Sequence, residues 1–230
     1  MPSLNTSSGS FRNRSLRAFR HPNFRWYYVS GLGASADMGM RQLVIPWLVL
    51  ELTGSVAQLG IVVFMQGFPM AIVALFGGVL ADRYDRRSLL IYTQFLIMGI
   101  IAVLAFLTLS EMVELWHIYF SSVILGIVQA MGNPSRQAFI ANLVTKDDRM
   151  NAVALNSMLQ HATRVIWPFL TGWLIISLGL GYTLAINASC LIVGIGGILM
   201  VRNVTNVDQA KAASPINQIK NGITYVSATP

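Results

Sequence analysis

Long runs of uncharged, mostly apolar residues recur along the chain, and they restrict its fold more than any other feature. Six runs lie at about residues 24–50, 57–81, 88–109, 115–135, 152–178 and 182–201. Each can cross roughly 30 Å of hydrocarbon as a helix, whose backbone satisfies its own hydrogen bonds. The composition agrees, because 54% of residues are hydrophobic and only 11% charged. We therefore expect an all-α integral membrane protein with six transmembrane helices.

Apart from Arg41 and Arg164, which lie inside runs, the basic residues occur in alternate loops only. They precede the first run and follow the second, fourth and sixth, at Arg12, Arg14, Arg17, Arg20, Arg25, Arg83, Arg86, Arg87, Arg136, Lys146, Arg149, Arg202, Lys211 and Lys220. The opposite loops carry Glu51, Glu111 and Glu114 and neither lysine nor arginine. The positive-inside rule then predicts that both termini are cytoplasmic. These clusters of basic residues, which lie where the chain leaves the membrane and are called membrane-exit collars below, explain the net charge of +7. The charge therefore does not indicate nucleic-acid binding.

Several functional classes are disfavoured by what the sequence lacks. Residues 1–23 are basic, but no short apolar region with a small-residue cleavage site follows, so we expect a cytoplasmic segment and not a cleaved signal peptide. A single cysteine, Cys190, excludes an internal disulfide and offers no metal cluster. Neither H-E-x-x-H nor G-x-S-x-G occurs, and the runs contain no paired carboxylates, so we expect no catalytic residues, no metal and no cofactor.

The link between the second and third runs, GGVLADRYDRR at residues 77–87, has charges at five of its last six positions. Basic residues alone would suffice to set the membrane topology, so the acidic Asp82 indicates a further role for this link. Gly77 and Gly78 would allow another backbone to approach closely. Glycines inside the runs, at Gly126, Gly172, Gly194 and Gly197, are similarly expected to allow close helix packing.

At this link the sequence resembles the major facilitator superfamily. The residues that carry the resemblance are Gly78, Leu80, Ala81, Asp82, Arg83, Arg86 and Arg87, which look like the superfamily's loop signature between helices two and three. The stretch at 133–175, which contains NPSRQAF and NAVALNS, is similar to the proton-antiporter branch that includes macrolide, multidrug and enterobactin-type exporters. The resemblance implies that Asp82, Arg83 and Arg86 form a gate network that stabilises one access state.

The resemblance also implies that part of the transporter is missing from this chain. The family has twelve helices in two halves with the substrate between them, and this sequence holds one half. We expect three parts: a basic cytoplasmic segment at 1–23, a six-helix bundle at 24–201 and a cytoplasmic linker at 202–230 leading to a missing second half. The tail SPINQIKNGITYVSATP resembles the segment that precedes helix seven in such exporters.

Two departures from the family pattern stand out. Asp85 occupies a loop position where glycine is usual. In the fifth run Pro168 and Gly172 match the antiporter signature, but Trp167 replaces its first glycine, which leaves a hinge there in doubt. The Trp167 indole either faces the cavity as a flat apolar surface or packs against a helix or lipid.

Ionisable residues at membrane depth are costly and are therefore functional candidates. Asp37 and Arg41 lie four residues apart on one face of the first run, and Arg164 lies in the middle of the fifth. Burial disfavours the charged form of a carboxylate, which suits Asp37 as a proton carrier, whereas Arg41 favours it. A proton carrier and a permanent ion pair therefore both remain open. Arg164 is expected to contact substrate or Asp37.

The remaining cavity candidates are polar residues inside the runs. Gln66, Asn156 and His161 are candidates to point into the cavity, although a histidine such as His161 is more often packed or hydrogen-bonded than a proton relay. With Asp37 ionised, the charges of Asp37, Arg41 and Arg164 sum to +1, which favours an anionic or neutral substrate.

Together these features predict a secondary active transporter, performing proton-coupled efflux of a small hydrophobic or anionic compound such as a drug or siderophore. Its expected partners are that substrate, protons, membrane lipid, and either the missing carboxy-terminal half or a second copy of the chain. The bacterial inner membrane is the expected location. The alternatives are an inactive fragment, a non-transporting membrane scaffold and a half-transporter that works as a homodimer.

Overall fold

The structure, a computed structural model, describes residues 17–83 and 85–201. The regular elements in these two ranges are all helices: η1 (Arg17–Arg20), α2 (Pro22–Thr53), α3 (Val56–Arg83), α4 (Arg86–Leu109), α5 (Leu115–Leu143), η2 (Lys146–Asp148), α6 (Arg149–Leu178) and α7 (Leu180–Met200). The long helices coincide with the apolar runs, which confirms the all-helical fold. Most of the expected basic segment and the whole expected linker lie outside the described residues.

Local sequence explains several helix ends. α2 has Pro22 in its first turn and ends at Gly54, where a φ of 62° lets the Gly54 N–H donate to the carbonyl of Leu50 at 2.8 Å. Glycine adopts this left-handed conformation without the steric cost of a Cβ. At the start of α4, the carboxylate of Asp85 accepts a hydrogen bond from the Ser88 N–H at 2.9 Å. The acidic departure from the family loop therefore caps a helix.

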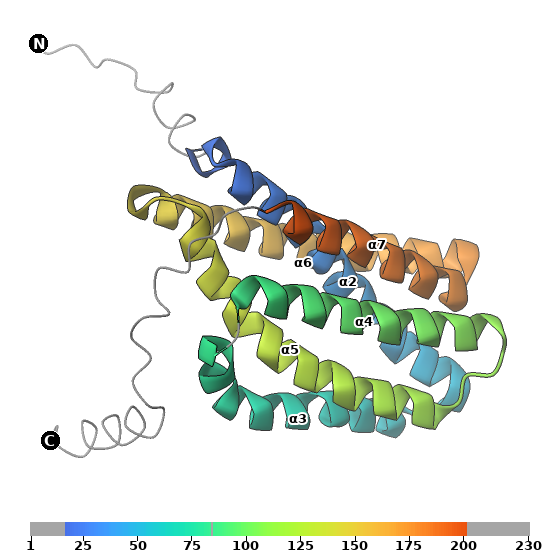
Figure 1. The fold of residues 1–230 in the computed structure, drawn as a ribbon. Coiled ribbons are helices and arrows are strands. Elements are labelled where there is room, and N and C mark those ends of the chain that lie inside the picture. The colour runs from blue at the N-terminus through green and yellow to red at the C-terminus, as the bar shows by residue number, and fades with distance from the viewer. Residues whose placement is uncertain (1–16, 84, 202–230) are drawn as a thin grey trace, which may run out of the picture.

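The helices pack in an order that differs from their order in the sequence. α3 packs on α5, α5 on α4, α4 on α7, α7 on α2 and α2 on α6. Figure 1 shows α6 and α7 on one side of α4, α5 and α3 on its other side, and α2 crossing behind α4. The larger buried cluster contains residues of all six long helices, and its fully buried members include Val44, Ile101, Leu125 and Leu184, all 0% exposed. α3 and α6 are the two ends of this series, and both carry many exposed apolar side chains.

Two glycines confirm the prediction of close helix contacts. A Cβ placed on Gly126 of α5 would lie 2.1 Å from the carbonyl oxygen of Gln66 in α3. A Cβ on Gly197 of α7 would lie 2.6 Å from the backbone nitrogen of Ser30 in α2. Any larger residue would push these backbones apart, so the glycines fix how closely the helices approach.

Two further predicted glycines behave differently from each other. Gly194 of α7 also meets its prediction, since a Cβ on the facing Gly33 of α2 would lie 2.5 Å from the Gly194 nitrogen. For Gly172 of α6 the prediction is wrong: the nearest atom to an added Cβ is Cδ2 of Leu43, at 3.9 Å. Here α6 meets a side chain and not a backbone, so the position has room for a larger residue.

Four helical segments in the described ranges are long and apolar enough to cross a membrane: Val56–Ala74, Arg86–Leu109, Leu115–Gln137 and Leu180–Met200. The long helices outside this set are α2 and α6. α2 contains Asp37 and Arg41, and α6 contains Asn156, Gln160 and Arg164. Their lower hydropathy therefore coincides with polar residues on specific faces, and those faces border the cavity described next.

Candidate functional site

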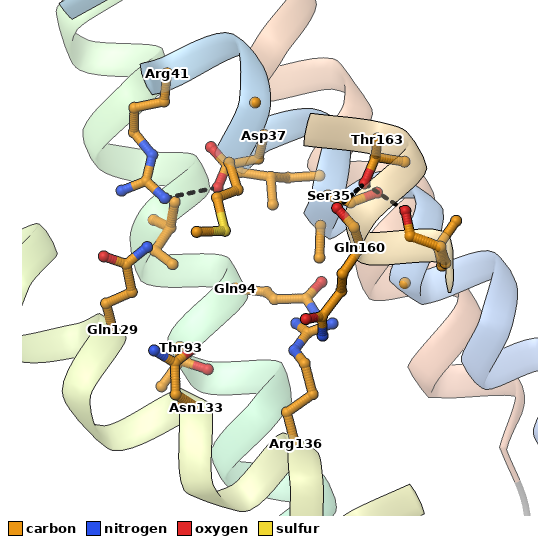
Figure 2. Close-up of a pocket in the computed structure, with 18 of the residues that line it drawn as sticks. Ser35, Asp37, Arg41, Thr93, Gln94, Gln129, Asn133, Arg136, Gln160 and Thr163 are labelled. Carbon is orange, nitrogen blue, oxygen red and sulfur yellow. Dashed lines mark hydrogen bonds and ion pairs between the residues drawn. The ribbon is translucent and has the colours of Figure 1, made fainter. Parts of the chain in front are cut away.

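A cavity of about 300 Å³ lies between α2, α4, α5 and α6, and Leu191 of α7 also lines it. Its wall is unusually polar for a chain of this composition. Figure 2 shows labelled polar side chains from all four helices around it. Besides charged groups, the wall includes the amides Gln42, Gln94, Gln129, Asn133, Gln137, Asn156 and Gln160. An amide-rich wall can both donate and accept hydrogen bonds, which suits a small polar ligand.

Asp37 and Arg41 form a buried ion pair at this cavity. Nη2 of Arg41 donates to Oδ2 of Asp37 at 3.0 Å, and the two residues are 5% and 3% exposed. Their i, i+4 spacing on α2 brings the two side chains together. Oδ1 of Asp37 and Nε and Nη1 of Arg41 are buried without a hydrogen-bond partner among the described residues. Because unpaired buried polar atoms are costly, these atoms are available to a ligand or to water.

Arg136 lies on the cavity wall, although the sequence placed it in a cytoplasmic collar. The difference arises because α5 continues to Leu143, beyond the expected end of its run at 135. Gln129, Asn133 and Arg136 share one face of α5, and Figure 2 shows Arg136 extending from α5 into the pocket. The i, i+4, i+7 spacing of these polar residues is a sequence signal that could have revealed the cavity face.

Gln94 is the second wall residue that the sequence reasoning missed. It lies in the middle of α4, is 2% exposed, and neither atom of its amide has a hydrogen-bond partner among the described residues. Thr93 beside it also lines the cavity. A pair of polar residues in the middle of an otherwise apolar run was the available signal.

On α6 the structure separates the candidates by helix face. Asn156 and Arg164 line the cavity, together with Gln160 between them. His161 is exposed and is not among the residues that line the cavity. It therefore does not occupy the cavity position expected from the sequence.

Trp167 and Gln66 also lie away from the cavity wall. A Cβ on Gly39 of α2 would lie 2.4 Å from Cβ of Trp167, so the glycine makes room for the tryptophan and the packing alternative describes this structure. α6 runs without a break through Trp167 and Pro168. Gln66 of α3 instead donates from Nε2 to Oε1 of Gln129 at 3.4 Å. Gln66 therefore hydrogen-bonds a cavity-lining residue without lining the cavity itself.

The gate motif is described only in part. The side chains of Gly78, Asp82 and Arg83 lie outside the described residues, so the expected gate network remains a prediction. Arg86 is the first residue of α4. Arg87 donates from Nη2 to the carbonyl of Leu199 at 2.9 Å and from Nε to that of Ile198 at 3.3 Å. A cation at these last carbonyls caps α7 and joins it to the start of α4.

The comparisons with known proteins agree with this architecture. Over residues 13–230 the sequence matches the family described as transmembrane secretion effector. The chain belongs to this family, which is part of the major facilitator superfamily. This confirms the resemblance drawn from the loop between α3 and α4 and from residues 133–175.

Individual relatives are exporters and transporters. The staphyloferrin A transporter of Staphylococcus aureus is 31% identical over 134 residues, which cover 57% of this chain and 33% of the relative. The enterobactin exporter EntS of Shigella boydii is 24% identical over 211 residues, 91% of this chain and 50% of the relative. That of Salmonella typhimurium is 28% identical over 170 residues, 74% of this chain and 41% of the relative. The chain spans about half the length of the curated relatives it matches.

Proposed function

We propose that this chain is the amino-terminal, six-span half of a secondary active exporter in the bacterial inner membrane. In this proposal 24–201 is the transmembrane bundle, 1–23 and 202–230 are cytoplasmic, and a small organic compound passes through the cavity of Figure 2. Membership of the transmembrane secretion effector family supports transport. The names of the relatives, an exporter of enterobactin and a transporter of staphyloferrin A, support export of a small molecule.

The observation that carries the coupling part of the proposal is the buried pair of Asp37 and Arg41. A proton on Asp37 would remove the negative charge that holds the Arg41 guanidinium at 3.0 Å. In the ionised pair, Oδ1 of Asp37, which has no hydrogen-bond partner among the described residues, would accept a hydrogen bond from a substrate group. Protonation of Asp37 would weaken this contact as well as the pair with Arg41. Proton and substrate would thus compete for Asp37, as a proton-driven antiporter requires.

The second half of the cavity has to come from elsewhere. A separate carboxy-terminal half would supply it, or a second copy of this chain would, since the two halves of this fold are related by an axis along the membrane normal. The competing proposal is a fragment or scaffold that does not transport. It is favoured if the chain neither pairs nor moves any compound.

The test is proton flux in proteoliposomes that contain the purified chain and an internal pH-sensitive dye. Under an imposed pH gradient, we expect a transported compound, tested first with enterobactin, staphyloferrin A and the cationic dye ethidium, to accelerate proton movement. Asp37→Asn should abolish this acceleration because the proton site is lost. Glu51→Gln, on an exposed acidic residue of the same helix, is the matched control and should leave it intact. A response unchanged by Asp37→Asn would overturn the role of Asp37.

Pairing and orientation need separate measurements. In a Cys190→Ser background, a cysteine at the exposed Val165 of α6 should cross-link between chains if two copies complete the cavity. Absence of any cross-link, with absence of flux, would favour the fragment. In intact cells an impermeant maleimide should label Met112→Cys and not Asp147→Cys, because the first lies in a loop expected outside and the second in one expected inside. The reverse pattern would invert the topology.

A further inference from the structure

The charged residues on the cavity wall are unbalanced. Asp37, Arg41, Arg136 and Arg164 line it, so the wall carries one carboxylate and three guanidinium groups, an excess of two positive charges. Asp37 is already paired with Arg41. The only other salt bridge among the described residues joins His21 to Asp148, so Arg136 and Arg164 face the cavity with no carboxylate partner in that part of the chain.

The two arginines without a carboxylate partner line the cavity from different helices. Arg136 extends from α5, and Arg164 lies on α6 one helical turn beyond Gln160. Figure 2 shows Arg136 and Gln160 pointing toward the middle of the pocket from these two helices. A guanidinium is always charged and matches a carboxylate with two parallel hydrogen bonds, which a compact ammonium does not. Two such groups on separate walls define two anion positions.

Gln94 provides the independent observation that points to a ligand. Its amide is 2% exposed, reaches the cavity from α4, and has both its oxygen and its nitrogen unpartnered among the described residues. A buried amide without partners costs free energy unless a bound molecule or water completes it. A neutral polar group of a ligand bound between the arginines would satisfy this amide.

We propose that the cavity binds an organic dianion, with one acidic group on Arg136, a second on Arg164, and a neutral polar middle against Gln94. This rests on the proposed function, whose substrate class it specifies. While Arg41 is bonded to Asp37, this pair contributes no net charge to the cavity. The two positive charges of Arg136 and Arg164 are then matched by two acidic groups of the ligand.

The test is a titration of the purified full chain in detergent at constant ionic strength, following the midpoint of thermal unfolding. The probes are adipate, monomethyl adipate and dimethyl adipate, which share one flexible skeleton and carry two, one and no negative charges. We expect a saturable rise with adipate, a weaker one with the monoester and none with the diester. Loss of one arginine contact should lower the affinity for adipate about tenfold, the size of one hydrogen bond to a charged group.

The variants decide whether these two arginines are responsible. Arg136→Gln and Arg164→Gln should each make adipate bind no better than the monoester, because only one anion position remains. Arg20→Gln, an exposed arginine on η1 away from the cavity, is the charge-matched control and should change nothing. If Arg136→Gln does not yield monodisperse protein, Arg136→Lys should show an intermediate loss, since it keeps the charge and loses the paired hydrogen bonds.

Each outcome bears on the proposal, and none is shared with the test of transport. Equal effects of the diester and adipate, or variants that bind adipate as the unaltered chain does, would overturn the dianion site while leaving transport of another compound intact. Arginine variants that change the oligomeric state without changing adipate binding would also overturn it, because the arginines would then pair with carboxylates of another chain. Adipate binding that follows the expected order without any proton flux would retain the site and reject the exporter.

Discussion

α6 and α7 follow one another in the chain and differ in polarity and in what surrounds them. α7 is mostly apolar, although it contains the buried polar residues Thr183 and Asn187, and its buried side includes Gly194 and Gly197 against α2. α6 has a polar face with Asn156, Gln160 and Arg164 on the cavity. Of these two helices, α7 alone is apolar enough to be recognised as a membrane span by composition. The difference between α6 and α7 therefore follows from the polar face that α6 presents to the cavity, whereas α7 packs mainly on its neighbours.

The largest expected effect tests the cavity side of this comparison. Arg41→Leu leaves the Asp37 carboxylate buried without its partner, and removing one member of a buried pair costs about 3 to 5 kcal/mol. We expect a loss near the lower figure, because Asp37 can take up a proton. The measurement is chemical unfolding in detergent at neutral pH. The double variant Asp37→Leu, Arg41→Leu should recover most of the loss, and no recovery would show that the charge was not its cause.

The next effect tests the packed side. Gly197→Leu forces a side chain against the backbone of α2 at Ser30, and overpacking of this kind costs about 1 to 3 kcal/mol. Gly196→Leu, one residue earlier on α7, is the matched control, since an added Cβ there has no atom of the described residues within 4 Å. The two variants should differ clearly in their midpoint of thermal unfolding. Similar midpoints would mean that the contact between α2 and α7 does not limit stability.

A smaller effect is expected at the start of α4. Asp85→Ala removes the acceptor for the Ser88 N–H, and loss of such a cap costs about 1 kcal/mol. Asp85→Asn keeps a side-chain acceptor and should retain most of the stability. Hydrogen exchange at the first turn of α4 would detect the change locally. If Asp85→Ala left exchange in this turn unaltered, the helix cap would not be the role of this residue.

The smallest effect is expected where α4 meets α7. Arg87→Gln removes the cation from the carbonyls of Ile198 and Leu199, an interaction worth about 0.3 to 1 kcal/mol. Arg87→Lys should preserve part of it because the charge remains. Faster hydrogen exchange confined to the last turn of α7 would support the capping role. An equal change throughout α4 and α7 would instead indicate a general loss of packing.

Sequence reasoning located the helices well and the cavity wall incompletely. Asp37, Arg41, Asn156 and Arg164 were identified because polar groups inside apolar runs are costly, and all line the cavity. Arg136 was missed because it lies near the end of its run, where an arginine also fits a membrane-exit collar. Distinguishing these two roles requires knowing how far α5 continues and which way it faces.

The sequence by itself determined that the chain is helical, and roughly where each helix begins and ends. The physical reason is local, because a backbone in hydrocarbon must form its own hydrogen bonds and charge is excluded from lipid. Only the tertiary structure decided which faces meet. Trp167 packs over Gly39, Gln94 of α4 reaches the cavity, and Arg87 caps α7 because of the rotation and depth of helices far apart in sequence. Those depend on contacts across the whole bundle, which no single run encodes.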